Sequence, residues 1–353
     1  MAYSLLLVFI LPALGVPFVY LAGKKSSRAA AFLVALIAIA NMALLFTTVP
    51  AILNNPTHEY VEPYEWINIL ESDFTLFVDG ISVSLAIITT VLIVVAAIFS
   101  VNYMEGKKNL PVYYSLLTLL SLGLIGVFIT SNLLLFYFCW ELMLVPAYFI
   151  IGNWGYRDSY KAAFKFFIFT HAGAVFVLLG IGAIYMVTGT TNMFDAQAAL
   201  VQNIPGIVPW ILLSLTAGFA VKMAVVPVHM WLPDAHSEAP SPMSALLSGV
   251  IISAGAYAIL RLSLGAVLPA VMDASFGSFG IDFMHGLAVF GVLSAFFGSL
   301  IALVETDIKR IIAYSSIAHM GYVMFGLSLF PTSTVGGVIT ITAAITGTVL
   351  HLV

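Results

Sequence analysis

WILLSLTAGFAVKMAVVPVHMWLPDAHSEAPSP, residues 210–242, decides how the rest of the chain is interpreted. It begins as an apolar membrane helix, carries Lys222 in its interior, and then reaches Pro227. An ammonium at that depth costs roughly 2.5–3.5 kcal/mol on insertion scales, so such residues usually face protein or a water-lined interior and mark an ion path. Because Pro227 cannot donate a hydrogen bond to the carbonyl of Met223, we expect the helix to be interrupted one turn beyond the lysine. Transporters place ion sites at such interrupted helices, and Lys222 is therefore the first candidate site residue.

Composition places the whole chain in the membrane. The 353 residues are 62% hydrophobic and only 8% charged, and the mean hydropathy is +1.11. These values predict a polytopic helical membrane protein and exclude a soluble domain. The single cysteine, Cys139, allows no internal disulfide and no cysteine-based iron–sulfur site, so any redox chemistry is expected in a partner. The charge is too sparse for nucleic-acid binding.

About eleven apolar stretches are long enough to cross a hydrocarbon core, which takes about 20 helical residues. They lie at approximately 2–23, 29–50, 78–102, 111–130, 133–152, 163–188, 207–228, 243–264, 285–304, 311–330 and 335–353. The fold class is therefore all-α, a transmembrane helical bundle with a broken seventh helix. The N-terminal stretch has no basic leader and no small-residue cleavage site, so we interpret it as a retained first helix.

Charges in the connections predict the orientation. Ten of the 12 lysines and arginines fall in alternate connections or in the helix ends beside them: Lys24, Lys25, Arg28, Lys107, Lys108, Arg157, Lys161, Lys165, Lys309 and Arg310. The positive-inside rule puts these on the cytoplasmic side and the N-terminus outside. Apart from Lys222, only Arg261 is left over, and we expect it at the outer end of its helix as an interfacial anchor. Tyr60, Tyr64 and Trp66 suggest a short interfacial helix within residues 51–77.

Glu141 is the second ionisable group that no loop explains. It lies near the middle of FYFCWELMLVPAYFIIG, and both Glu141 and Lys222 are followed five residues later by a proline, Pro146 and Pro227. Each proline deprives a carbonyl of its donor beside an ionisable side chain. The repeated arrangement favours a coupled Glu–Lys pair whose mutual charge sets both proton affinities, and the alternative is a hydrogen-bonded pair that only joins helices.

Histidines extend this pattern. His171, His319 and His351 fall inside apolar stretches, where a lone histidine is often only a core residue. Taken with Glu141 and Lys222, they suggest a proton relay in the membrane plane. The segment HMWLPDAHSEAP also offers four potential metal ligands, His229, Asp234, His236 and Glu238, but their spacing fits no helical zinc motif and we predict no metal site.

Three segments resemble one family: FYFCWELMLVPAYFIIGNWG (136–155), VKMAVVPVHMWLPDAHSEAPSPMSALLSG (221–249) and ETDIKRIIAYSSIAHMGY (305–322). They are similar to the antiporter-like membrane subunits of respiratory complex I and of its archaeal and hydrogenase relatives, with the subunit M branch the best match. Related subunits occur in multisubunit sodium/proton antiporters. The resemblance implies a proton-translocating subunit of an NADH:quinone-type oxidoreductase in a prokaryotic plasma membrane. It also implies that the iron–sulfur clusters, flavin and quinone belong to other membrane and peripheral subunits.

The resemblance also assigns residues. Glu141 matches the glutamate of the family's fifth helix, Lys222 the lysine of its broken seventh helix, and His319 the histidine of the YSS-x-x-HMG motif. Ser253 stands where the family commonly has a lysine, so a relay through this position would need water, with His171 or His319 compensating. The resemblance further implies N-terminal helices at 1–110, a first antiporter-like repeat at 111–264 and the start of a second at 265–353, and we expect the chain to be truncated there. Two other functions fit the same residues, a cation/proton antiporter subunit and a non-pumping membrane scaffold.

Overall fold

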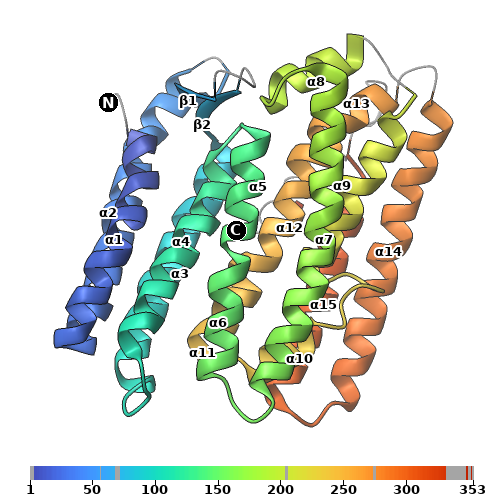
Figure 1. Ribbon diagram of the computed structural model, residues 1–353. Coiled ribbons are helices and arrows are strands. Elements are labelled where there is room, and N and C mark those ends of the chain that lie inside the picture. Colours follow the sequence, from blue (N-terminus) through green and yellow to red (C-terminus); the bar gives the residue numbers. More distant parts are fainter. Residues whose placement is uncertain are drawn as a thin grey trace. The chain divides into compact units, whose positions relative to one another are not determined.

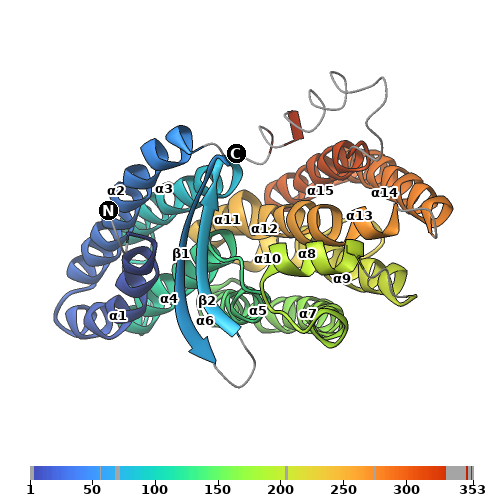
Figure 2. The ribbon, with the colours of Figure 1, turned by 90° about the horizontal axis from the view of Figure 1, so that it is seen from above.

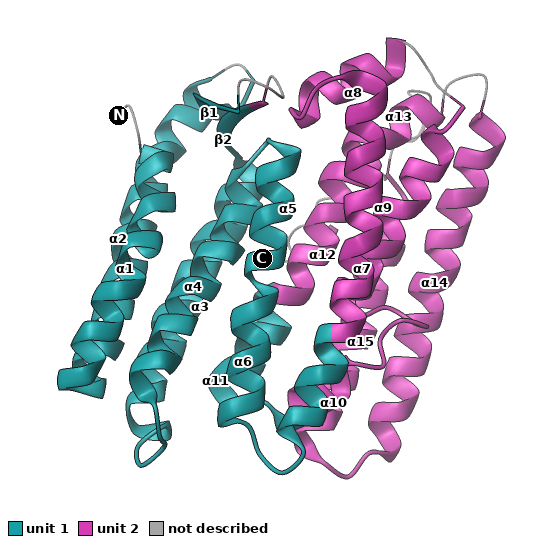
Figure 3. Cartoon of the chain, in the orientation of Figure 1, with its two compact units in different colours: residues 1–68, 73–167, 238–250 teal, residues 69–72, 168–237, 251–353 magenta. Residues whose placement is uncertain are grey.

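The structure, a computed structural model, describes residues 4–55, 57–67, 72–202, 206–272, 276–330, 347–348 and 351. These residues are mostly helical, as the composition predicts, and they form two compact units (Figure 3). Unit 1 comprises residues 1–68, 73–167 and 238–250, and unit 2 comprises residues 69–72, 168–237 and 251–353.

Unit 1 is a bundle of long apolar helices capped by a two-stranded sheet. Its elements are α1 (Ser4–Lys25), α2 (Ser27–Asn54), β1 (Glu59–Ile67), β2 (Ser72–Asp79), α3 (Gly80–Tyr103), α4 (Leu110–Ile129), α5 (Leu133–Leu142), α6 (Leu144–Trp154), the first part of α7 (Ser159–Thr188) and α11 (Ser241–Leu246). Figure 1 shows the connections α1–α2, α3–α4 and α6–α7 at one end of this unit and the sheet at the other. The three basic clusters of unit 1 therefore share one end, as the alternating charge pattern predicts.

Unit 2 contains the broken helix. It comprises the rest of α7, α8 (Met193–Gln202), α9 (Val208–Met223), most of α10 (Leu232–Glu238), α12 (Ile252–Ala258), a π-helical stretch (Ile259–Val267), α13 (Leu268–Val271), α14 (Gly277–Val304) and α15 (Ile308–Leu327). Another π-helical turn, Leu247–Ile251, joins α11 to α12. Seen from above, α14 and α15 lie side by side (Figure 2).

Eight helical stretches of the described residues are long and apolar enough to cross a membrane. They are α1, α2, α3, α4, Leu133–Trp154, α7, Ser241–Val271 and α14. The predicted stretches 207–228 and 311–330 contain the shorter helix α9 and the less apolar helix α15. Most of the predicted stretch 335–353 lies outside the described residues.

The interfacial helix expected within residues 51–77 is wrong, because strands β1 and β2 occupy most of this segment. In β1 the side chains of Tyr60, Glu62 and Tyr64 share one face at the period of two that a strand imposes. Both tyrosine hydroxyls donate to the Glu62 carboxylate at 2.8 Å. The same carboxylate accepts from the backbone N–H groups of Leu5 and Leu6, each at 3.1 Å. These two donors belong to the first turn of α1, where a negative charge is stabilised, so Glu62 ties the sheet to this helix.

The position expected for Arg261 is also wrong. The helical stretch that contains it runs from Ser241 to Val271, well past the boundary expected near residue 264. Arg261 therefore lies inside the helix, within the π-helical part, and its guanidinium carbon lies 5.4 Å from the centre of the Tyr257 ring. The apolar residues that follow, including Leu262 and Leu264, continue the helix and are themselves buried.

Candidate functional site

Helix α9 ends immediately after Lys222. Its last residue is Met223, and Ala224 takes the left-handed conformation with φ +58° and ψ +44°. The interruption predicted from Pro227 is therefore confirmed, but it begins at Ala224 and not one turn beyond the lysine. The chain does not resume a helix until Leu232, where α10 begins. A non-glycine residue is rarely left-handed, so the surrounding contacts must hold the chain in this conformation.

Hydrogen bonds from three directions satisfy the backbone at this break. The carbonyl of Val221 accepts from the N–H of Ala224 at 3.2 Å and from the indole Nε1 of Trp231 at 2.8 Å. The N–H of Val226 donates to Ser294 Oγ of α14 at 2.8 Å. The exposed carbonyls at the end of a membrane helix need such donors, because lipid offers none. Trp231 and Ser294 thus stabilise the break.

The Lys222 side chain is buried, with 2% of its surface exposed. It lies in the last turn of α9, where the helix dipole presents its negative end and favours a positive charge. A buried ammonium next to interrupted backbone is the arrangement expected of an ion-conducting position.

Helix α12 packs against the end of α9. A Cβ placed on Gly255 would lie 2.7 Å from the backbone nitrogen of Met223, so the two helices approach to backbone contact there. Ser253 is on the same helix, two residues before Gly255, and is 4% exposed. The position where the resemblance expects a lysine is therefore buried on the helix that contacts the break.

A second interruption follows Glu141. Helix α5 ends at Leu142 and α6 starts at Leu144, with Met143 between them. The N–H of Met143 still bonds to the carbonyl of Cys139 at 3.1 Å, so this is a local irregularity in a nearly continuous span. Glu141 and Lys222 each occupy the position before the last residue of an interrupted helix. The two backbones differ, however: α9 ends at the left-handed Ala224, whereas Met143 keeps right-handed helical angles, φ −77° and ψ −20°, and the span continues.

The six predicted relay residues divide between the two units. Glu141 belongs to unit 1, and Lys222, Ser253, His171, His319 and His351 belong to unit 2. Within unit 2 the structure brings two of them together: the rings of His319 and His351 are stacked, with their centroids 5.0 Å apart and an interplanar angle of 26°. His171 lies in α7 with an exposed side chain.

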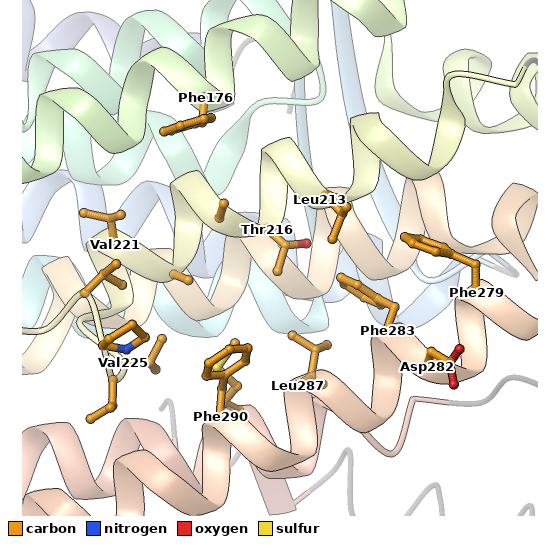
Figure 4. Close-up of a pocket in the computed structure, with 17 residues that line it drawn as sticks. Phe176, Leu213, Thr216, Val221, Val225, Phe279, Asp282, Phe283, Leu287 and Phe290 are labelled. Atoms are coloured by element: carbon orange, nitrogen blue, oxygen red, sulfur yellow. The ribbon is translucent and has the colours of Figure 1, made fainter.

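An apolar cavity of about 550 Å³ lies beside α9 (Figure 4). Val221, Val225 and Pro227 line it from the break, and a row of α14 side chains from Phe279 to Phe290 lines it from the opposite side. Its polar lining residues are Thr216 and Asp282, whereas Lys222 does not line it. The apolar cavity therefore adjoins the break without including Lys222.

The loop residues considered as metal ligands have other contacts. Asp234 pairs with Arg310 at 2.9 Å, and the Glu238 carboxylate accepts from the N–H of Asp158 at 3.0 Å. His236 is buried in α10, and burial together with the charge of Lys309 lowers its pKa to about 4. Over the described part of the chain, no three histidine, cysteine or acidic side chains are grouped so that they could hold a metal ion.

Sequence reasoning missed Trp231 and Ser294, which hold the break in place. A signal for Trp231 was present, since an indole N–H needs a partner when buried and the residue lies within the HMWLP segment. Ser294 gives no such signal, because a serine in a membrane helix commonly bonds its own preceding turn, as Ser294 also does with Phe290 O at 2.7 Å.

Residues 130–353 match the family described as NADH:quinone oxidoreductase/Mrp antiporter, TM. The chain belongs to this family. A relative within it, NADH-quinone oxidoreductase subunit M of Rickettsia conorii, is 36% identical over 341 residues, which are 93% of this chain and 66% of the relative. The chain thus spans slightly less than two thirds of that protein.

Two solved structures share the fold of this family member. A chain of the Mrp complex from Dietzia sp. DQ12-45-1b superposes with a TM-score of 0.80 over 99% of this chain and 36% of that chain. A chain of respiratory complex I from Thermus thermophilus gives a TM-score of 0.75 over 98% of this chain and 70% of that chain. Both are 23% identical in sequence, so they establish the antiporter-like membrane fold.

Proposed function

We propose that this chain translocates protons as a membrane subunit of a complex I-like NADH:quinone oxidoreductase. The observation that carries the proposal is the buried Lys222 at the end of the interrupted helix α9 in a member of this family. The relative from Rickettsia conorii, named as a subunit of an NADH-quinone oxidoreductase, supports the choice of complex. Flavin, iron–sulfur clusters and quinone would belong to partner subunits. We further propose that the chain lies in a bacterial plasma membrane with its N-terminus outside, and that its repeats have the boundaries given above.

Lys222 is the central proton carrier in this proposal. Burial penalises its ammonium form, whereas the negative end of the α9 dipole favours it, as would a carboxylate at close range. A change in the electrostatic influence of Glu141 would therefore load or release the proton at Lys222. Ser253 would carry the proton onward through water, and His171, His319 and His351 would extend the relay.

Donor-driven proton uptake in inverted membrane vesicles tests this function. Lys222→Ala and Glu141→Gln are compared with wild type at matched amounts of assembled complex. We expect uptake to fall at least tenfold in both variants while the complex still assembles. Full uptake in both variants would refute the proposed mechanism, and a loss confined to assembly would support the scaffold function.

A cation/proton antiporter subunit is the second candidate. The superposition on a chain of the Mrp complex supports this candidate at the level of the fold. Uptake that proceeds without an electron donor and depends on sodium would identify this function, whereas strict dependence on a donor would reject it.

A further inference from the structure

A glycine of a neighbouring helix contacts the backbone at the break in α9 and at the irregularity between α5 and α6. In unit 2, a Cβ on Gly255 of α12 would lie 2.7 Å from the nitrogen and 3.0 Å from the Cα of Met223. In unit 1, a Cβ on Gly123 of α4 would lie 2.7 Å from the nitrogen and 3.0 Å from the Cα of Met143. Met223 directly follows Lys222, and Met143 lies two residues after Glu141. The same contact thus occurs at the break that ends α9 and at the irregularity between α5 and α6.

The atoms in contact decide what these glycines do. At Gly180, the atoms that an added Cβ would meet most closely belong to the side chain of Leu215, which can change rotamer. At Gly255 and Gly123 they are backbone atoms, so the helices themselves would have to separate. Moving from 2.7 Å to an ordinary contact of 3.4 Å takes about 0.7 Å. The terminal turn that carries the ionisable residue would move with the backbone.

We propose that Gly255 and Gly123 are positioning residues, which fix the backbone of each break and thereby the placement of Lys222 and Glu141. The consequence for proton transfer rests on the proposed function, because an error of about 1 Å in a proton carrier weakens its coupling to its neighbours. The placement of the backbone does not depend on that function.

The test is Gly255→Ala with two matched controls from α14. Gly286→Ala adds a methyl group where no atom lies within 4 Å. Gly291→Ala adds a methyl group 2.6 Å from the backbone nitrogen of Phe325, an equally tight backbone contact that lies between α14 and α15. The purified complexes are compared by amide hydrogen exchange over residues 221–228 and by the pH profile of donor-driven proton uptake, with Lys222→Ala in parallel.

We expect Gly255→Ala to raise exchange over residues 221–228 at least fivefold and to shift the pH midpoint of uptake by at least 0.5 unit. Neither control should produce either change. Wild-type exchange in Gly255→Ala, or equal changes in Gly291→Ala, would overturn the inference. If Lys222→Ala abolishes uptake, raised exchange in Gly255→Ala without a shift in its pH profile would also overturn the inference.

The outcome for Lys222→Ala separates the two proposals. If that variant keeps full uptake, the proposed function fails, and hydrogen exchange alone decides whether Gly255 positions the break. Should Gly255→Ala not assemble, Gly123→Ala tests the same inference, with exchange over residues 139–146 and the same two controls.

Discussion

Arg310 Nη1 lies 2.9 Å from Asp234 Oδ1, and Nε of the same guanidinium lies 2.8 Å from Glu305 Oε1. One side chain therefore joins α10, which follows the break in α9, to the turn between α14 and α15. The planar guanidinium suits this double contact, whereas a lysine offers only a point charge. Burial alone would lower the pKa of Arg310, but the hydrogen bond and charge of Glu305 and the charge of Asp234 outweigh it and raise the pKa.

Replacing Arg310 should loosen α10. The three side chains are 21–33% exposed, so we expect Arg310→Met to cost only about 1 kcal/mol after solvent screening. Hydrogen exchange over residues 232–238 should rise about fivefold, which is that free energy expressed as a ratio. Lys161→Met is the control, because its pair with Asp158 is 86% and 67% exposed and should contribute nothing measurable. Equal effects of the two substitutions would contradict this role for Arg310.

His236 should make the docking of α10 depend on pH. Its pKa is about 4 in the folded chain and about 6.5 when exposed, so the unfolded form binds the proton first as the pH falls. Docking is therefore fully stable above pH 6.5 and weakens between pH 6.5 and 4, by roughly 1.4 kcal/mol per pH unit. The protection factors of residues 232–238, which compare exchange with the intrinsic rate at each pH, should show this slope when measured against pH. His236→Gln should flatten it, and a slope that persists in that variant would assign the effect to another group.

Much of the fold followed from hydropathy, because lipid leaves a spanning segment few choices other than a helix. Glu141 and Lys222 were found for the same reason, since a charge in an apolar stretch is costly enough to stand out. The sheet was missed because Tyr60, Tyr64 and Trp66 were judged as interfacial residues, whereas their spacing about Glu62 has the period of a strand. Arg261 was misplaced because the helix was expected to end near residue 264, whereas it continues to Val271.

The exact site of the α9 break could not be obtained from Pro227. A proline removes one hydrogen bond, but where the helix ends depends on which tertiary donors satisfy the freed carbonyls. Here Trp231 bonds to Val221, and the chain turns at Ala224. Such contacts join residues that only the folded chain brings together.

Glu62 should hold the sheet onto α1. Burial alone would raise its pKa, but donors from Leu5, Tyr60, Tyr64 and Leu6 outweigh that effect and lower it. The resulting stability is present above the ordinary pKa of 4.5 and is lost as the pH falls through the lower folded value. We expect Glu62→Gln to cost roughly 2 kcal/mol in attachment of the sheet, since the amide keeps one acceptor and loses the charge.

The control for Glu62 is Glu65→Gln, which removes the same charge from the same strand at an exposed position. Limited proteolysis of residues 55–79 in the purified complex measures attachment of the sheet. Faster cleavage in Glu62→Gln than in Glu65→Gln is expected, and the reverse order would show that the carboxylate of Glu62 does not hold the sheet.

Ala224→Gly should stabilise the break in α9. Ala224 has φ +58°, where a side chain costs about 1–2 kcal/mol and glycine costs nothing, although glycine returns part of the gain through the freedom of the unfolded chain. We expect a net gain of about 1 kcal/mol, seen as a higher midpoint of thermal denaturation in detergent. Ala217→Gly is the control, because it places the same substitution inside α9, where it should lose about 1 kcal/mol. Opposite signs for the two variants would mean that Ala224 is held in the left-handed conformation, whereas a loss in both would mean that it is not.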